Sequence, residues 1–282
     1  MSGIAIVTDS TCTIPDDLIA KYKIGVAPQV LIWEGKTLYD GVDMTPQQFY
    51  EKLAQASQLP TTSQATVASF QKLFAPLVQQ GRPIVAILLS SKLSGTVQSA
   101  LQAKQDFPGA QIEVIDTDTV GMALGWQVLL AARQVEAGAS FQDVVAAARE
   151  AKKHVGILIV VDTLEFLHRG GRIGGAARLV GTLLNFKPIL EVQDGRVEPL
   201  ERVRTRAKAM GRMLELVEQR IQGHNNVRIS AMHGMAEQDA RSILEQAEAH
   251  FHPIETTLSW ATPVLGAHTG PGTLALSYCV DL

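Results

Sequence analysis

The sequence has no long hydrophobic run, and this absence excludes two classes of protein at once. No apolar stretch reaches the roughly 18 residues that a membrane-spanning helix needs. The opening segment MSGIAIVTDS also lacks the basic region and long apolar core of a signal peptide. We therefore expect no stable membrane insertion and a cytoplasmic location.

Cysteine is scarce as well, with only Cys12 and Cys279 at opposite ends of the chain. No CxxC pair occurs, which leaves no zinc ligand set and no thioredoxin-like motif. The histidines form no HExxH motif, so a metal site has little support. The glycine-rich loop of nucleotide-binding proteins and the GxSxG turn of serine hydrolases are also missing, and GGRIGG lacks the spacing of a dinucleotide fingerprint. We expect no metal and no cofactor.

Neither sign of charge dominates, because 25 basic residues stand against 28 acidic ones and the formal net charge is −3. No stretch concentrates Lys and Arg without compensating carboxylates, which argues against a nucleic-acid partner. Hydrophobic residues make up 46% of the 282 residues, enough for a substantial core. This length favours two domains over one.

The first part of the chain alternates short β-branched runs with helical periodicity, the pattern of a doubly wound, mainly parallel α/β sheet. Runs with no polar residue inside are typical of strands buried on both faces. The expected strands are 4–10, 84–89, 111–115 and 156–162, and the expected helices include 45–57, opened by Thr45 and Pro46, one from Thr62 or Ser63 to Gly81, and one capped by Ser140.

The pattern then changes, because Asp194-Gly195 between two extended runs is a strong hairpin signal. An antiparallel element therefore enters, and we expect a second α/β domain with a mixed sheet. Helices at 205–222 and 235–250 flank the strand VRISAMHG, and two final strands enclose the loop PVLGAHTGPGT. We place the domains at 1–160 and 161–282.

Hydroxyl side chains gather at four expected strand or helix ends. The carboxyl ends of strands in a doubly wound sheet converge on a ligand crevice, although such residues also serve as ordinary helix caps. The corner Ser94-Gly95-Thr96 after the strand at 84–89 is typical of an oxyanion-binding turn. The four clusters are Thr8, Ser10, Thr11 and Thr13; Thr61, Thr62 and Ser63; Ser90, Ser91, Ser94 and Thr96; and Thr117 and Thr119.

Two further features could complete an anion site. His268 stands in GAHTGPGT, whose Gly-Pro-Gly indicates a backbone close to something bulky or planar; it can donate to a carboxylate or simply pack against its own turn. Arg202, Arg204 and Arg206 follow the hairpin, where guanidinium groups suit carboxylates but also occur at solvated strand ends.

An alternative function rests on VIDTDTV at 114–120, a strand that ends in DxDxT. In aspartate-dependent phosphoryl hydrolases the first aspartate attacks and the second protonates the leaving group, here Asp116 and Asp118. That chemistry also needs a later carboxylate pair for Mg²⁺, and no GD or DD dipeptide follows a later apolar strand. A Mg²⁺-dependent small-molecule phosphatase therefore stays the weaker hypothesis.

Several segments together resemble the DegV family of bacterial fatty-acid-binding proteins. They are IVTDSTCTIP, PTTSQAT, SSKLSGTVQSA, IDTDTVGMALG, LEFLHRGGRIGGAARLVGTLLNFKPIL and GAHTGPGTLAL, and they follow the family's order over nearly the whole chain. The resemblance implies a two-domain, non-enzymatic carrier. Such a carrier buries one long-chain fatty acid between its domains and presents the carboxylate to the catalytic subunit of a fatty-acid kinase, which makes acyl phosphate.

The resemblance also implies which residues carry this role. Thr62, Ser63, Ser94 and the Gly95 amide are expected to hold the carboxylate, beside His268. Arg204 is the expected basic neighbour, with Arg202 and Arg206 two residues to either side. Arg169 and Arg172 in HRGGRI resemble the surface on which the kinase docks.

Overall fold

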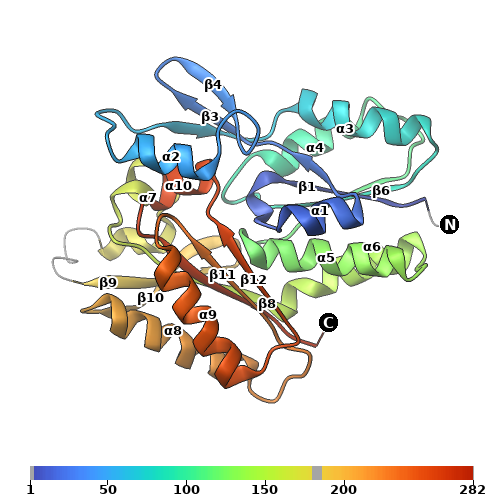
Figure 1. Ribbon diagram of the computed structural model, residues 1–282. Helices are drawn as coiled ribbons and strands as arrows, with labels where there is room; N and C mark the ends of the chain where they lie inside the picture. Colours follow the sequence, from blue (N-terminus) through green and yellow to red (C-terminus); the bar gives the residue numbers. More distant parts are fainter. Residues whose placement is uncertain (1–2, 180–185, 282) are drawn as a thin grey trace.

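The computed structural model describes residues 3–179 and 186–281, which form an α/β fold built on three β-sheets (Figure 1). One sheet is parallel and four-stranded, one is mixed and six-stranded, and one is antiparallel and three-stranded. The expected fold class is confirmed. Residues 180–185, part of the glycine-rich segment that carries the family resemblance, lie outside the described residues, as do 1–2 and 282.

The four-stranded sheet is the first expected element. Its spatial order is β2-β1-β6-β7, with strands β1 (Ala5–Asp9), β2 (Gly25–Ala27), β6 (Ile84–Leu88) and β7 (Ile112–Asp116). Along β6 the side chains alternate between two hydrophobic clusters, Ala86 in one and Val85 and Ile87 in the other. The unbroken apolar run in the sequence reflects this burial on both faces.

Helices cover both faces of this sheet (Figure 1). One face packs against α3 (Val67–Gln79) and α4 (Thr96–Lys104), and the other against α5 (Met122–Glu136) and α6 (Phe141–Glu150), with α1 (Asp16–Tyr22) beside α5. Helix α6 begins as its sequence predicts, because the Ser140 side chain accepts a hydrogen bond from the Asp143 amide at 3.2 Å. Short 3₁₀ turns lie at Ser10–Cys12, Ala151–His154 and Gly174–Leu179.

The six-stranded sheet is mixed, as expected for the second part of the chain. Its order is β10-β9-β8-β13-β11-β12, with β8 (Val155–Val160), β9 (Lys187–Gln193), β10 (Arg196–Val203), β11 (Arg228–His233), β12 (Glu255–Trp260) and β13 (Leu274–Cys279). Helices α8 (Arg206–Ile221) and α9 (Glu237–Phe251) cover one face. Strands β9 and β10 are joined at Asp194 and Gly195, both with positive φ, which confirms the predicted hairpin.

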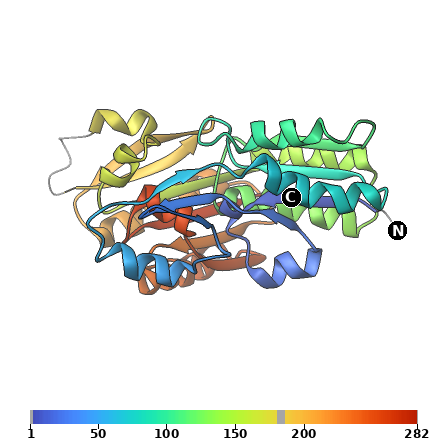
Figure 2. The same cartoon turned by 90° about the horizontal axis from the view of Figure 1, so that it is seen from above.

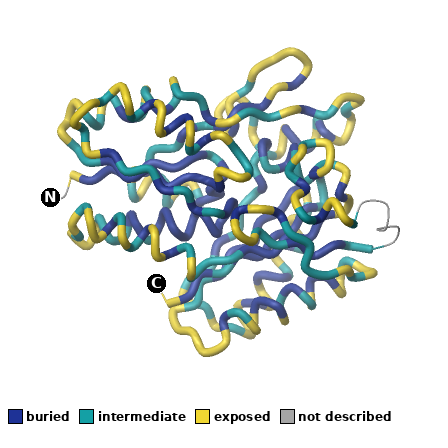
Figure 3. The backbone as a smooth tube through the Cα atoms, turned by 180° about the vertical axis from the view of Figure 1, so that it is seen from behind, coloured by how far each residue is buried: buried dark blue, intermediate teal, exposed yellow. Residues whose placement is uncertain are grey.

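Helix α5 lies between the two large sheets. It contacts β1 and β6 of the parallel sheet and also β8 and β13 of the mixed sheet, and ten of its residues are buried. Figure 2, the view from above, shows the two sheets arranged end to end, and Figure 3 shows the buried backbone concentrated in the strands and this junction. Helix α5 therefore packs against both large sheets.

The assignment of residues 156–162 to the first sheet is wrong. Strand β8 pairs antiparallel with β13 and with β9, inside the mixed sheet. Its apolar run indicated a strand buried on both faces, but such a run is the same whichever sheet supplies the neighbours. The domain boundary at residue 160 stays a prediction, and the position of β8 favours a division ahead of Val155.

The three-stranded sheet, ordered β4-β3-β5, was not expected. It consists of β3 (Val30–Trp33), β4 (Lys36–Tyr39) and β5 (Thr61–Ser63), and α2 (Pro46–Leu53), α7 (Glu165–Arg169) and α10 (Pro263–Thr269) lie near it (Figure 1). Helix α2 begins as predicted, since Thr45 accepts from the Gln48 amide at 3.3 Å and Gln48 accepts from the Thr45 amide at 3.0 Å.

No described helix is long and apolar enough to cross a membrane.

Two local expectations near this sheet are corrected. Thr62 and Ser63 do not begin a helix; they lie on β5, and the following helix is capped by Thr66, which accepts from the Ser69 amide at 3.1 Å. The expected loop around His268 contains helix α10. Thr262-Pro263 repeats the Thr-Pro signal that marked α2, so this helix could have been predicted.

Asp40 joins the three-stranded sheet to α10. Its carboxylate accepts a hydrogen bond from the Ser10 hydroxyl at 2.6 Å and another from the Val264 amide, in the first turn of α10, at 3.1 Å. The residue is buried, and burial raises the pKa of Asp40 to about 6, with its hydrogen bonds opposing that rise. A buried carboxyl group thus holds the helix that carries His268.

This carboxyl group predicts a pH dependence of stability. Between about pH 4 and pH 6 the folded protein keeps a proton that the unfolded chain, with an ordinary carboxyl pKa near 3.9, has lost. The contribution of Asp40 to the free energy of unfolding is therefore fully present below about pH 4 and is lost as the pH rises through 6. Relative to Asp40→Asn, the wild-type protein should lose unfolding free energy on the order of a few kcal/mol between pH 4 and 7, as measured by urea unfolding of both proteins. Identical pH profiles of the two proteins would contradict the prediction.

Candidate ligand-binding site

A cavity lies where the three sheets meet, with an empty volume of about 700 Å³ that includes the part open to solvent. Thr11 and Leu89 reach it from just beyond the carboxyl ends of β1 and β6. Thr62 contributes from β5, and Ile159 and Leu190 from the mixed sheet. The cavity therefore occupies the carboxyl edge of the parallel sheet, where doubly wound folds commonly bind ligands.

Most of the cavity wall is aliphatic. The side chains come from the loop after β6, from α7 and α10, and from three strands of the mixed sheet. These side chains include Leu93, Ile159, Leu167, Leu190, Val197 and Leu265. Such a wall offers no hydrogen-bonding groups and suits a hydrocarbon.

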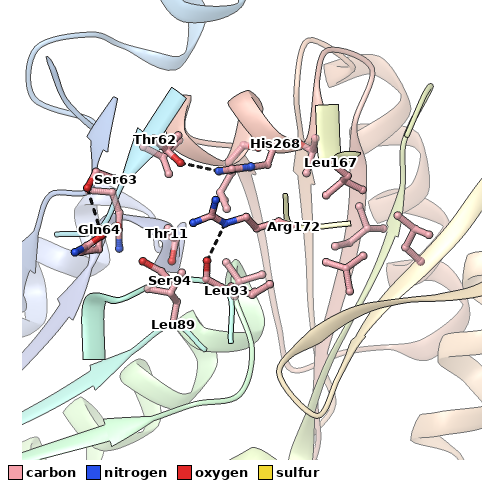
Figure 4. Close-up of a pocket in the computed structure, with 18 residues that line it drawn as sticks. Thr11, Thr62, Ser63, Gln64, Leu89, Leu93, Ser94, Leu167, Arg172 and His268 are labelled. Carbon is pink, nitrogen blue, oxygen red and sulfur yellow. Dashed lines mark hydrogen bonds between the residues drawn. The ribbon is translucent and has the colours of Figure 1, made fainter. Parts of the chain in front are cut away.

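Three hydroxyl groups gather at the other end of the cavity. Thr62, Ser63 and Ser94, which the sequence placed in two separate clusters, all line it (Figure 4). Of the other predicted hydroxyl residues Thr11 also lines it, whereas Thr117 donates to the Leu88 carbonyl at 2.8 Å. The structure thus brings together the hydroxyl groups that the sequence singled out as a carboxylate site.

Gly95 stands at the N-cap of α4, directly after Ser94. The first amides of a helix have no partner within the helix, and the helix dipole favours an anion there. A Cβ at position 95 would lie 3.2 Å from Cδ of Gln64, a further residue that lines the cavity. A side chain at this position would require the end of the Gln64 side chain to shift by a small amount.

His268 lies beside Thr62. Its Nε2 atom is 2.7 Å from the Thr62 hydroxyl oxygen, and its Nδ1 atom is buried with no hydrogen-bond partner among residues 3–179 and 186–281. Burial, reinforced by the positive charge of Arg172, lowers the pKa of His268 to about 4. The imidazole is neutral near pH 7. We assign the proton to Nε2, because the other tautomer leaves a buried N–H without an acceptor.

Arg172 is the basic residue that lines the cavity. Its Nε donates to the Leu93 carbonyl at 3.0 Å and one terminal nitrogen donates to the Gly170 carbonyl at 2.8 Å. Figure 4 shows its guanidinium group between the Thr62–His268 pair and Ser94. The sequence assigned Arg172 only to a partner surface, and its spacing gave no sign that it turns inward.

The structure does not bring Arg204 to the cavity. Arg204 is exposed in the turn between β10 and α8 and is not among the described residues that line the cavity. Arg202 is exposed too, and Arg206 is bound to Asp239 at 2.8 Å and to the Gly272 carbonyl at 2.6 Å. Arg202 lies on β10, and Arg204 and Arg206 follow the end of this strand at Val203.

A second hollow lies outside the hydroxyl end of the cavity. It shares Thr62, Arg172 and His268 with the cavity and is also lined by Arg169 and Leu59. Arg169 is exposed and pairs with Glu165 at 2.7 Å one turn earlier in α7. The hydroxyl end can therefore be approached from the surface that carries the two arginines of HRGGRI.

The Gly-Pro-Gly segment after His268 takes the unusual path that its sequence indicated. Gly270 and Gly272 have φ values of 76° and 78°. A Cβ at position 270 would collide with the ring of Phe166, and one at position 272 with the carboxylate of Asp162. Both glycines are needed for this close approach, and the planar neighbour is Phe166.

The two aspartates of the phosphatase hypothesis hold a turn together. The Asp116 carboxylate accepts from the Ser91 amide at 3.2 Å and from the Asp118 amide at 3.0 Å. Asp118 pairs with Lys152 at 2.8 Å. Within the described part of the chain, neither aspartate lines the cavity, and no group of three His, Cys, Asp or Glu side chains is placed to hold a metal ion. Both carboxylates thus have structural partners.

Fold and cavity together define an α/β protein with an internal site between its sheets, polar at one end and aliphatic along the rest. Residues 3–281 match the family model described as "Uncharacterised protein, DegV family". A DegV domain-containing protein of Halalkalibacterium halodurans is 36% identical over all of both chains. The chain belongs to the DegV family, and the resemblance seen in its sequence is confirmed.

Solved structures of the family are also similar. A DegV family protein from Thermus thermophilus, described by its fatty acid binding, is 33% identical and superposes with a TM-score of 0.93 over 98% of this chain and 99% of its own. A stearic acid-binding protein from Eubacterium ventriosum is 25% identical, with a TM-score of 0.92 over 99% and 98%. These proteins share the fold of this chain over nearly its full length.

Proposed function

We propose that this protein binds one long-chain fatty acid in the cavity and presents its carboxylate to a fatty-acid kinase, without turnover of its own. The observation that carries this proposal is the division of the cavity into an aliphatic body and a hydroxyl end with one arginine. Two relatives support it, because the T. thermophilus protein is described by its fatty acid binding and the E. ventriosum protein as stearic acid-binding.

The aliphatic part of the cavity and its hydroxyl end contribute very different free energies of binding. Burying a 16-carbon tail at about 0.8 kcal/mol per methylene gives an upper value on the order of 10 kcal/mol. A neutral hydrogen bond contributes about 1 kcal/mol. The tail therefore supplies most of the affinity, and the hydroxyl end fixes the position of the carboxylate.

The head group is met mainly by neutral donors. With the proton of His268 on Nε2, the Thr62 hydroxyl accepts from the imidazole and keeps its own hydrogen for the ligand. Ser94 adds a second hydroxyl group, Ser63 lies beside it with its hydroxyl donating to the Gln64 side-chain oxygen at 3.3 Å, and Arg172 adds the positive charge. Two of the five N–H groups of Arg172 donate to backbone carbonyls. Because the other donors at this end are neutral, we expect the ligand oxygen to stay a usable nucleophile toward a phosphoryl group.

The partner surface in this proposal is the outer hollow that carries Arg169 and Arg172. It adjoins Thr62 and His268, so a kinase seated there reaches the carboxylate while the tail stays buried. Arg169 is exposed and does not line the cavity that holds the fatty-acid tail, so its positive charge is available to the kinase.

Native mass spectrometry of the purified protein, followed by denaturation and lipid analysis, tests the binding proposal directly. We expect a mass excess of one fatty acid that is released on unfolding. A protein that stays unliganded after incubation with long-chain fatty acids would overturn the proposal. Mg²⁺-dependent release of phosphate from an aryl phosphate, lost in Asp116→Asn, would instead support the phosphatase hypothesis.

Ser94→Ala tests the division of labour between tail and head group. Loss of one neutral hydrogen bond, about 1 kcal/mol, should weaken fatty-acid binding only about 5-fold. Acyl phosphate formation with a purified kinase subunit should fall much further, because the carboxylate loses its orientation. The matched control is Ser91→Ala, an exposed serine in the same loop that does not line the cavity. Equal losses in binding and phosphorylation would count against the idea.

A further inference from the structure

Gln29 connects the two polar segments of the site, although no sequence pattern marked it. It lines the cavity and is only 2% exposed. Its side-chain oxygen accepts from the Ala65 amide, just after β5, at 3.0 Å. Its side-chain nitrogen donates to the Thr96 hydroxyl, at the start of α4, at 2.9 Å. One buried amide thus joins the segment of Thr62 and Ser63 to the segment of Ser94.

The orientation of this amide is fixed. The Ala65 amide can only donate, so it requires the oxygen of Gln29 on its side, and the NH₂ group must face Thr96. The backbone of Gln29 is held as well, because its N–H donates to Ser10 at 3.1 Å and its carbonyl accepts from the Asp40 amide at 2.9 Å. The side chain has no freedom to exchange its donor and acceptor.

A fixed amide sets the direction of the next hydrogen bonds. Thr96 accepts from Gln29, and its single hydrogen has two candidate acceptors, Ser94 at 2.9 Å and the Gln29 oxygen at 3.2 Å. The Gln29 oxygen is farther away and already accepts from Ala65. The shorter distance favours Thr96 as the donor to Ser94, which leaves the hydrogen of Ser94 for the cavity.

We propose that Gln29 and Thr96 are positioning residues that set the polarity of Ser94, so that the site selects ligands whose head group only accepts hydrogen bonds. The relay runs from the Gln29 amide through the Thr96 hydroxyl to the Ser94 hydroxyl and on to the ligand. A carboxylate can accept the Ser94 hydrogen with either of its two oxygens, whereas a primary amide of the same chain length has a single oxygen for it and turns its NH₂ group toward the remaining donors. This inference rests on the proposed function, since it concerns the head group of the fatty acid.

The test compares hexadecanoic acid with hexadecanamide on the delipidated full-length protein, by displacement of a fluorescent fatty-acid probe. The acid-to-amide affinity ratio isolates the polarity of the site, because the tail contribution is the same for both ligands. We expect the ratio to fall about 5-fold in Gln29→Leu and in Thr96→Val, and to return in Thr96→Ser, which keeps the hydroxyl group. Gln127→Leu removes another buried glutamine amide, away from the described cavity lining, and should leave the ratio unchanged.

A double-mutant cycle separates the relay from a general loosening of the site. In a Ser94→Ala background, Gln29→Leu should have no further effect on the ratio, because the relay has lost its last member. If Gln29→Leu weakens the acid and the amide by the same factor, the residue has only a structural role and the relay is overturned. Failure of the wild-type protein to bind the acid would overturn the proposed function and the relay with it. Binding of the acid with an unchanged ratio in both variants would overturn the relay alone.

Discussion

Replacing Leu265 with tryptophan is expected to abolish high-affinity binding of long-chain fatty acids. Leu265 lies on α10, is partly buried, and contributes to the aliphatic wall of the cavity. The indole fills space that the tail needs. Displacing about four methylenes costs about 3 kcal/mol, which is roughly a 200-fold loss of affinity.

Chain length makes this prediction specific. An eight-carbon acid needs less of the cavity and should lose much less affinity than a 16-carbon acid, as measured by calorimetric titration of both. The matched control is Leu101→Trp, which places the same side chain at a leucine of α4 that is 39% exposed. Equal losses for the short and long acids, or an unchanged affinity for the long one, would show that the tail does not occupy this cavity.

Arg172→Gln is expected to weaken fatty-acid binding by about 10- to 100-fold, the effect of losing about 1.5–3 kcal/mol from a hydrogen bond to a charged group. Arg172 lies among the hydroxyl groups, whereas Arg204 is exposed away from the cavity, so Arg204→Gln should leave the affinity unchanged. Titration of both variants with one fatty acid decides between the arginine that the sequence favoured and the arginine that the structure places at the site.

Arg172 also supports the backbone at Leu93 and Gly170, so a structural effect has to be separated from a charge effect. The matching fatty alcohol provides the separation. Its uncharged head group should bind Arg172→Gln nearly as well as it binds the wild-type protein. A comparable loss for the acid and the alcohol would mean that Arg172 acts only by holding the loop, and a large loss in Arg204→Gln would restore the original assignment.

The features that the sequence determined are those set by near neighbours along the chain. The apolar run of β6 indicated burial on both faces, and Asp194-Gly195 indicated the hairpin because few other residues adopt positive φ at low cost. The cap at Thr45 places α2 in the same way. The hydroxyl clusters were recognisable too, because their position after strands of a parallel sheet brings them to one edge.

Tertiary structure alone decided which partners these elements meet. Strand β8 joined the mixed sheet because β13, more than a hundred residues later, supplies its neighbour. Threonine favours strands locally, but Thr62 became part of one because β3 pairs with it. Arg172 faces the cavity and Arg204 does not, although their sequence surroundings favoured the reverse. Gln29 had no local signal, since its partners Ala65 and Thr96 are distant in the chain. Local patterns record which backbone conformation a segment prefers and how much of it is buried. The choice among distant partners depends on packing summed over the whole chain, which no short stretch of sequence contains.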